Sequence, residues 1–177
     1  MAQEHEVHIR NAHRDEWQAA IELTIKAYQQ YAGSFGPLFW QQYVDNIRWQ
    51  WEKQEQAERL VAFVAGELAA ALLLYPPQKG LYEKLDTTIP YPEIRLLGVL
   101  PAMRGKGVAT ALIRESAERA ARAGYPYVGL HTTELMPQAV RLYQRLGFER
   151  APEFDFYGDN RIVVEAYRLP VSVPLSS

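Results

Sequence analysis

The N-terminal part of the chain changes from a strand-like to a helix-like pattern of apolar residues. Val7–Arg10 alternates apolar and polar side chains, which predicts a first strand. From about Asp15 the apolar residues recur at the three- and four-residue spacing of an amphipathic helix. Gly33–Pro37 interrupts this pattern, and a second helix is predicted from about Leu38 to Gln56.

The middle of the chain has the pattern of a β-hairpin followed by a long loop. Two apolar runs, Leu60–Ala65 and Leu68–Tyr75, flank Gly66-Glu67, which predicts two strands joined by a tight turn. A proline-rich loop of about sixteen residues then leads to Pro92. Loops of this length within a compact domain are often functional.

The C-terminal half alternates strands and helices. The predicted elements are a strand over Glu93–Val99, a helix from near Gly107 to Gly124, a strand over Tyr127–Thr132, a helix from about Pro137 to Leu146, and a last strand from about Ile162 to Leu169. The order β-α-α-β-β-β-α-β-α-β-β predicts an α/β (α+β) protein with a mixed sheet and helices on both faces. We expect a single domain over residues 1–170 and a C-terminal tail over 171–177.

The composition is that of a soluble globular protein. Of the 177 residues, 48% are hydrophobic and 23% are charged, which is close to average. The longest apolar run has eight residues, whereas a membrane-spanning helix needs about 20. The N-terminus lacks the basic start and apolar stretch of a secretory signal. The absence of cysteine excludes disulfides and thiolate metal sites. We therefore expect a cytoplasmic protein without membrane association.

The charges are unevenly distributed along the chain. Residues 101–150 carry eight Lys or Arg against four Asp or Glu, while the rest of the chain carries eleven against seventeen. A net charge of −2 disfavours nucleic-acid binding, which needs a basic surface. The basic segment could instead hold a compact polyanion. A split that arose by chance is the alternative.

The basic segment begins with a glycine-containing loop that lies between a predicted strand and a predicted helix. Arg104-Gly105-Lys106-Gly107 follows the strand and opens the helix. Backbone N–H groups at a helix N-terminus suit a phosphate, and glycine lets the chain approach it closely. The dinucleotide fingerprint fails because Thr110 stands where a glycine is needed. The Walker loop fails because Gly107 follows Lys106. A structural turn with solvated charges is the alternative to a phosphate site.

Two blocks of this sequence resemble the GNAT superfamily of acetyl-CoA-dependent N-acetyltransferases. The segment 104–109 (RGKGVA) fits the signature R/Q-x-x-G-x-G/A, and the segment 139–148 (AVRLYQRLGF) is similar to A-x-x-L-Y-x-x-x-G-F. The spacing between the blocks also matches, and the predicted element order fits the family's mostly antiparallel central sheet from about Val7 to Leu169.

The resemblance implies that acetyl-CoA is the co-substrate and that no metal is needed. It implies that the loop binds the pyrophosphate of coenzyme A through the backbone of Arg104, Gly105, Lys106, Gly107, Val108, Ala109 and Thr110. It also implies that the backbone of Leu97, Gly98 and Val99 pairs with the pantetheine arm, where the fourth and fifth strands separate.

Two residues are candidates for proton transfer. Glu93 lies eleven residues before Arg104, the position of a glutamate base in relatives that use one. Tyr143 matches the family's tyrosine acid, which would protonate the departing thiolate. The alternatives are a charged residue at a strand start for Glu93 and a core tyrosine for Tyr143. His131 has no partner at metal-ligand spacing and is interpreted as a strand histidine.

The acceptor is predicted less sharply. Met136 replaces an asparagine that often bonds the pantetheine arm in relatives, which puts that contact in doubt. Acceptor pockets of this fold use the segments that here contain Tyr31, Phe35, Glu153 and Asp155. Aromatic walls with carboxylates would suit a cationic amine, although aromatic residues at helical spacing are also typical of a core.

Two classes of function therefore stay open. The first is an N-acetyltransferase that acts on a primary amine of a small molecule, peptide or protein by direct attack in a ternary complex. The second is a non-catalytic acyl-CoA-binding sensor or interaction module on the same fold. Glu93 and Tyr143 favour the enzyme. The expected partners are the amine acceptor and no nucleic acid, with a homodimer left open.

Overall fold

The computed structural model describes residues 6–78, 82, 84–158 and 161–172. The chain forms two compact units that interrupt each other in sequence. The first unit comprises Met1–Leu74 and Leu96–Glu115, and the second comprises Tyr75–Arg95 and Ser116–Ser177. The expectation of one domain over 1–170 stays a prediction. Residues 173–177 of the predicted tail lie outside the described residues.

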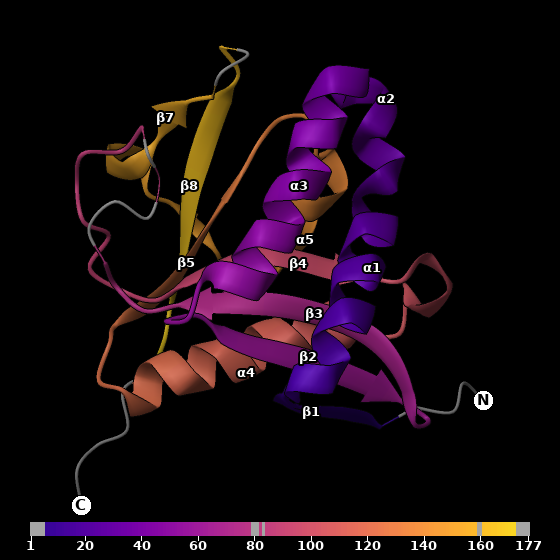
Figure 1. Ribbon diagram of the computed structural model, residues 1–177. Helices are drawn as coiled ribbons and strands as arrows, with labels where there is room; N and C mark the ends of the chain where they lie inside the picture. Colours follow the sequence, from indigo (N-terminus) through magenta and orange to yellow (C-terminus); the bar gives the residue numbers. More distant parts are fainter. Residues whose placement is uncertain (1–5, 79–81, 83, 159–160, 173–177) are drawn as a thin grey trace, which may run out of the picture. The chain divides into compact units, whose positions relative to one another are not determined.

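The first unit contains the N-terminal strands and helices (Figure 1). Its elements are β1 (Val7–Asn11), α1 (Trp17–Tyr28), α2 (Ala32–Phe35), α3 (Pro37–Lys53), β2 (Glu58–Val64), β3 (Glu67–Tyr75, up to Leu74), the end of β4 (Glu93–Val99) and the start of α4 (Val108–Arg122). Short 3-10 turns lie at Arg14–Glu16, Gln29–Tyr31 and Pro101–Met103. Strands β1 and β2, and β2 and β3, pair antiparallel.

The hairpin turn between β2 and β3 lies one residue earlier than its sequence predicts. Val64 pairs with Glu67, so the two-residue loop is Ala65-Gly66 and not Gly66-Glu67. Both loop residues have positive φ, 51° at Ala65 and 79° at Gly66, as two-residue hairpin loops of type I′ require. Because alanine seldom adopts this conformation, the sequence pointed to the wrong pair.

Helix α3 ends at Lys53, three residues before the predicted end at Gln56. The buried guanidinium of Arg59 donates hydrogen bonds to the carbonyl oxygens of Trp51 (2.8 Å), Gln54 (3.0 Å) and Ala57 (3.1 Å). The last carbonyls of a helix need such donors. A side chain from the next strand therefore terminates the helix.

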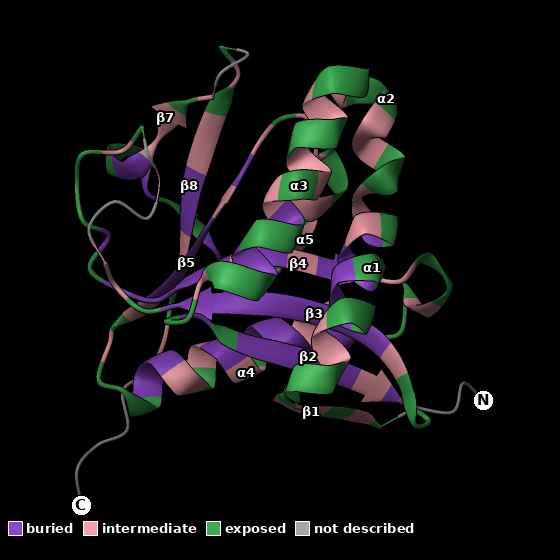
Figure 2. Cartoon of the chain, in the orientation of Figure 1, coloured by how far each residue is buried: buried purple, intermediate pink, exposed green. Residues whose placement is uncertain are grey.

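The core of the first unit lies along β2, β3 and the inner sides of α1 and α3. Figure 2 shows β2 and β3 buried over most of their length, while α3 is mostly exposed or intermediate and buries Ile47, Gln50 and Trp51. Ala20, Ile21, Ile47, Leu60 and Leu72 are each at most 1% exposed. Helix α1 buries Ala20, Ile21, Leu23, Thr24 and Ala27, which agrees with the amphipathic pattern predicted for the first helix.

The second unit holds the start of β4, the end of α4, and all elements after it. These are β5 (Tyr127–Thr132), α5 (Pro137–Arg145), β6 (Glu149–Arg150), a 3-10 turn at Pro152–Phe154, β7 (Phe156–Tyr157) and β8 (Val163–Pro170). Strand β5 pairs parallel with β4, joining Glu93 to Gly129 and Ile94 to Leu130. It pairs antiparallel with β8, which also pairs antiparallel with β6 and β7.

The strand order is β1-β2-β3-β4-β5-β8-β6, with β7 beside β8. The predicted mixed, mostly antiparallel sheet is confirmed, and β4 and β5 have the predicted bounds. The last strand is shifted by one residue from its prediction, and the short strand β6 precedes it. Two-residue strands such as β6 and β7 are too short for a periodic pattern to predict.

Candidate active site

The loop between β4 and α4, in the first unit, has its backbone N–H groups available at a helix N-terminus. Gly105 and Gly107 adopt φ of 75° and 76°, values that favour glycine. The N–H of Ala111 donates to the carbonyl of Gly107 at 3.0 Å as the helical pattern begins. The N–H groups of the residues before Ala111 therefore precede the first helical bond and suit an anion.

The side chain of Arg104 binds the end of helix α1. Its guanidinium donates to the carbonyl oxygen of Ala27 at 3.0 Å and to Oε1 of Gln30 at 3.1 Å. A cation at this position also complements the negative end of the helix dipole. Arg104 therefore anchors the loop, while the exposed Lys106 is the loop's other cation.

The end of β4 combines a departure from extended geometry with close packing. Leu96 has φ of 55°, which is uncommon for a non-glycine residue within a strand. Gly98 is buried, and a Cβ added there would lie 3.1 Å from Cβ of Ala27. The neighbouring Leu97 and Val99 are half-buried. Helix α1 therefore packs closely against the backbone of the predicted pantetheine segment.

Glu93 is buried at the start of β4, in the second unit, with its carboxylate in a polar cluster. Its residue exposure is 1%. The hydroxyl of Tyr82 donates to Oε1 at 3.0 Å, and Nδ1 of His131 forms a hydrogen bond with the same oxygen. Burial, and next the charge of Glu93, raise the pKa of Tyr82 well above its usual value. Tyr82 therefore stays a proton donor at ordinary pH.

His131 takes part in this cluster, which sequence reasoning missed. Its side chain is 3% exposed, and Nε2 lies 2.9 Å from the carbonyl oxygen of Phe154. Its ring lies 4.5 Å from the ring of Tyr82 and 5.3 Å from that of Phe156. The sequence separation from Glu93 is 38 residues, so spacing along the chain could not reveal the pair.

Gly129 provides the room that the cluster needs. A Cβ at this position would lie 2.5 Å from Cε2 of Tyr91 and 2.7 Å from Oε2 of Glu93. Both distances are shorter than real Cβ contacts, so the side chains of Tyr91 and Glu93 lie directly over the glycine. A glycine inside a strand often marks such a close approach, and this was the available sequence signal.

Tyr143 lies on α5 and is half-buried. Its ring centroid is 5.5 Å from that of Phe148, whose N–H donates to the Tyr143 carbonyl at 3.0 Å. Met136 precedes the helix and accepts a bond from the N–H of Val140 at 3.2 Å. The contact between Tyr143 and Phe148 joins two residues of the second motif.

The four predicted acceptor residues belong to two different environments. Tyr31 and Phe35 are half-buried in the first unit, with ring centroids 6.3 Å apart. Glu153 pairs with Arg168 at 3.0 Å in the second unit. Asp155 is bound by two nitrogens of Arg150, at 2.9 and 2.5 Å, and by the N–H of Ala166 at 2.8 Å.

These bonds offset the charge of both carboxylates. Burial acts to raise the pKa of Asp155, but the hydrogen bonds from Arg150 and Ala166 outweigh it, so the pKa is lowered. Asp155 is therefore ionised and already paired. A cationic acceptor would have to compete with Arg150 for the Asp155 carboxylate. The binding of the acceptor by Glu153 and Asp155 stays a prediction.

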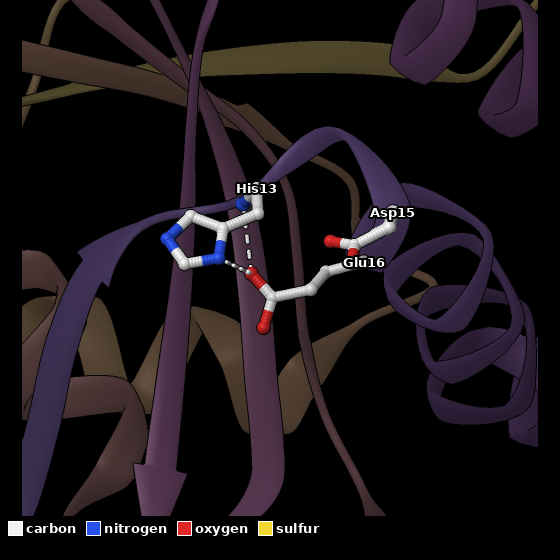
Figure 3. A group of neighbouring side chains, drawn as sticks. All are labelled: His13, Asp15 and Glu16. Atoms are coloured by element: carbon white, nitrogen blue, oxygen red, sulfur yellow. Dashed lines mark hydrogen bonds and ion pairs between the residues drawn. The ribbon is translucent and has the colours of Figure 1, made fainter.

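Figure 3 shows the group His13, Asp15 and Glu16, whose ligand atoms lie within 4.8 Å of one another. Arg10 binds both oxygens of Glu16, at 2.7 and 2.8 Å, and the N–H of His13 donates to Oε1 at 2.7 Å. These bonds, led by that of Arg10, lower the pKa of Glu16 to about 2. The group is explained as a cap of the turn before α1, and the expectation of no metal stays a prediction.

The described helices include none that is long and apolar enough to span a bilayer. This finding agrees with the short apolar runs of the sequence.

Comparisons with known proteins point to one family. The chain is 40% identical over 57 residues to the uncharacterized N-acetyltransferase YjgM of Escherichia coli, a match covering 32% of this chain and 34% of that protein. The chain thus matches about a third of that relative's length.

Two solved structures share the fold over nearly the whole chain. The crystal structure of histone acetyltransferase HPA2 and related acetyltransferase from Corynebacterium glutamicum is 19% identical, with a TM-score of 0.72 and coverage of 96% of this chain and 99% of that one. The PaiA N-acetyltransferase of Thermoplasma acidophilum, in complex with coenzyme A, is 14% identical, with a TM-score of 0.68 and coverage of 91% and 98%.

The model of the acetyltransferase (GNAT) family matches residues 17–148, about three quarters of the chain. The match contains both the glycine loop before α4 and the Tyr143–Phe148 segment. This chain is therefore a member of the GNAT acetyltransferase family.

Proposed function

We propose that this protein transfers an acetyl group from acetyl-CoA to a primary amine by direct attack in a ternary complex. The observation that carries the proposal is the loop before α4, where Gly105 and Gly107 adopt left-handed φ. Such a loop presents backbone N–H groups to a pyrophosphate. Membership of the family supports the same reaction.

The loop residues fit coenzyme A. A Cβ added at Gly105 or Gly107 would meet no atom within 4 Å, so the backbone there is open to a ligand. We infer that the N–H groups of residues 105–110 and the charge of Lys106 bind the phosphates, and that the backbone of Leu97–Val99 binds the pantetheine arm. A structural neighbour was solved with coenzyme A. When bound, acetyl-CoA supplies the activated thioester.

Two side chains of the second unit are proposed to move protons. Glu93 accepts a proton from the ammonium group of the acceptor, directly or through water, which makes the nitrogen nucleophilic. Tyr143 donates its hydroxyl proton to the departing sulfur, and its phenolate takes up the second proton that the nitrogen loses as the amide forms. The burial of Glu93 and its hydrogen bonds hold the carboxylate in one orientation, which supports this role.

The acceptor is proposed to be an amine of a small molecule, peptide or protein. The half-buried rings of Tyr31 and Phe35 would contact its apolar part or its charge. The ion pairs of Glu153 and Asp155 leave these carboxylates a weaker role in binding a cation.

The test is a direct assay. The purified chain is mixed with acetyl-CoA and a panel of alkyl amines, amino acids and peptides, and free thiol is measured together with acetylated product. Amine-dependent release of thiol would support the proposal. Calorimetric binding of acetyl-CoA without release across the panel would contradict it and favour the non-catalytic sensor.

Replacement of Tyr143 by Phe tests the proposed acid. The change keeps the ring contact with Phe148 and removes only the hydroxyl. We expect turnover to fall about 10²-fold, a usual size for general acid catalysis, with unchanged affinity for acetyl-CoA. Tyr125→Phe, at a half-buried tyrosine before β5, is the control. If Tyr143→Phe and the parent have equal turnover while the chemical step limits the rate, Tyr143 is not the acid and only packs against its neighbours.

A further inference from the structure

The imidazole of His131 connects Glu93 to the backbone of the second unit. Nδ1 forms a hydrogen bond with Oε1 of Glu93, and Nε2 lies 2.9 Å from the carbonyl oxygen of Phe154. Both side chains are almost fully buried, at 3% and 2% exposure. A buried ionisable pair costs desolvation energy, so this arrangement calls for a reason beyond packing.

The chemistry of the partners restricts where protons can lie. A carbonyl oxygen can only accept a hydrogen bond, so Nε2 of His131 must carry a hydrogen. If Nδ1 and the carboxylate oxygen both lacked a proton, two acceptors would face each other at hydrogen-bond distance. One proton therefore lies between Nδ1 and Oε1. Tyr82 donates a second hydrogen bond to the same oxygen.

We propose that His131 is a positioning residue that makes Glu93 and His131 a single proton-accepting pair. This inference rests on the proposed function. The arrangement in the structure is the protonated, neutral form of the pair, and the form that accepts a proton lacks this shared proton and carries one negative charge. The acceptor's ammonium N–H bond breaks, and its proton reaches Glu93, directly or through water, and comes to lie between Oε1 and Nδ1. The amine becomes neutral and so does the pair, and the proton later leaves to solvent.

The groups around the pair act on its charge in opposite directions. Tyr82, from the loop before β4, donates to Oε1. Burial, and next the charge of Glu93, raise the pKa of Tyr91, so this phenol stays neutral. Arg95 of β4 lies over the Tyr82 ring, 4.5 Å from its centroid. Asp155 interacts with His131 electrostatically, but its charge is paired with Arg150.

The pair can be tested without any turnover. Nitrogen-15 NMR of histidine-labelled protein reports the protonation of each ring nitrogen, and His131→Asn assigns the signals of His131. We expect Nε2 to stay protonated across pH in the parent, while Nδ1 gains and loses a proton. In Glu93→Gln this Nδ1 protonation should be lost at pH values where the parent shows it. An unchanged Nδ1 titration in Glu93→Gln would overturn the proposal.

Kinetics supplies the second arm. In His131→Asn an amide can still donate toward Glu93 but cannot take up a proton. We expect kcat to fall about tenfold or more, less than for loss of the base itself because Glu93 remains, with a changed pH profile and an unchanged KM for acetyl-CoA. His8→Asn, at an exposed histidine of β1, is the matched control.

The two arms separate the possible failures. A loss of kcat with an unaltered pH profile would assign His131 a structural role and overturn the pair. If no amine is acetylated but the NMR coupling is present, the proposed function fails while the shared proton stands. If His131→Asn melts at a clearly lower temperature, His131→Gln, which can still bond the Phe154 carbonyl, repeats both measurements.

Discussion

The glycine loop and the Glu93 cluster are built from different kinds of groups. The loop at Arg104–Thr110 offers backbone N–H groups on an exposed turn, and neighbouring residues in the chain set its geometry. The cluster is buried, and it brings together the side chains of Glu93, Tyr82 and His131 with the carbonyl of Phe154. Its members lie 11, 38 and 23 residues apart along the chain.

This difference determines what each region tolerates. A site made of backbone groups survives many side-chain changes but fails when the backbone can no longer adopt positive φ. A site made of buried side chains fails when one hydrogen-bonding atom is removed, because its partner is left unsatisfied. A substitution that only restricts the backbone should therefore impair the glycine loop. A substitution that only removes a hydrogen-bonding atom should impair the Glu93 cluster.

The largest effect is expected for Glu93→Gln, which keeps the shape of the side chain and removes the base. A protonated alkyl amine has a pKa near 10.4, so little of it is nucleophilic at neutral pH. We expect turnover at pH 7 to fall about 10²-fold or more. The deficit should shrink as the pH rises and free amine accumulates, while acetyl-CoA affinity stays unchanged.

The measurement is the pH profile of turnover from pH 7 to about pH 9.5, below the amine pKa. Glu118→Gln, at an exposed carboxylate of α4, is the control for loss of one charge. An equal deficit at both ends of this range would mean that Glu93 positions the substrate and accepts no proton. Unchanged activity would mean that the proton leaves through water or through another group.

The sequence predicted the elements whose pattern is local. The bounds of β4 and β5 were predicted correctly because each is a short apolar run between turn signals. The end of α3 and the hairpin turn were misplaced, since Arg59 caps the helix from the next strand and Ala65 adopts a conformation that alanine disfavours. A side chain that caps a helix from outside it, and a strained backbone, leave little trace in a periodic pattern.

The candidate site divides in the same way. The glycine loop could be predicted because its residues are adjacent and its glycines have a conformational role. The role of His131 could not, because its partners come from the start of β4 and from the turn at Phe154. The ion pair of Glu153 could not be recognised because its partner Arg168 lies 15 residues away on β8. Arg150 is five residues from Asp155, and the turn at Pro152–Phe154 that lies between them has no periodic pattern to predict it.

Gly129→Ala tests the packing over the buried cluster. The added Cβ would lie 2.5 Å from a ring carbon of Tyr91 and 2.7 Å from Oε2 of Glu93. We expect a loss of about 1–3 kcal/mol in the free energy of unfolding, the usual cost of overpacking. Urea denaturation gives the value. Gly98→Ala, whose Cβ would lie 3.1 Å from Ala27, should cost less. Equal stability of Gly129→Ala and the parent would show that the cluster can readily shift.

Gly107→Val tests the backbone site. Its φ of 76° is strained for valine, and a side chain would obstruct the approach of the phosphates. We expect acetyl-CoA affinity, measured by calorimetry, to fall about tenfold or more, which is about 1.4 kcal/mol. Gly66→Val, at φ of 79° in the hairpin turn and equally open to solvent, carries the same strain away from the loop. Equal affinities of the two variants would remove the loop from the binding site.

The smallest effect is expected for Glu16→Gln, at a carboxylate whose role is structural. Arg10 lowers the pKa of Glu16 from 4.5 to about 2 in the folded protein, so the ionised form stabilises the fold above pH 4.5 and this stabilisation is lost as the pH falls toward 2. Glutamine keeps an oxygen for the N–H of His13 and loses only the charge. We expect the variant to be about 1 kcal/mol less stable at pH 7, the upper range for a partly exposed ion pair, and the deficit to be smaller at pH 3. Thermal or urea unfolding at both pH values measures it. An equal loss of stability at pH 3 and pH 7 would mean that the charge of Glu16 contributes nothing to the free energy of unfolding. Acetylation by the variant should match that by the parent, because Glu16 lies outside the proposed proton pathway.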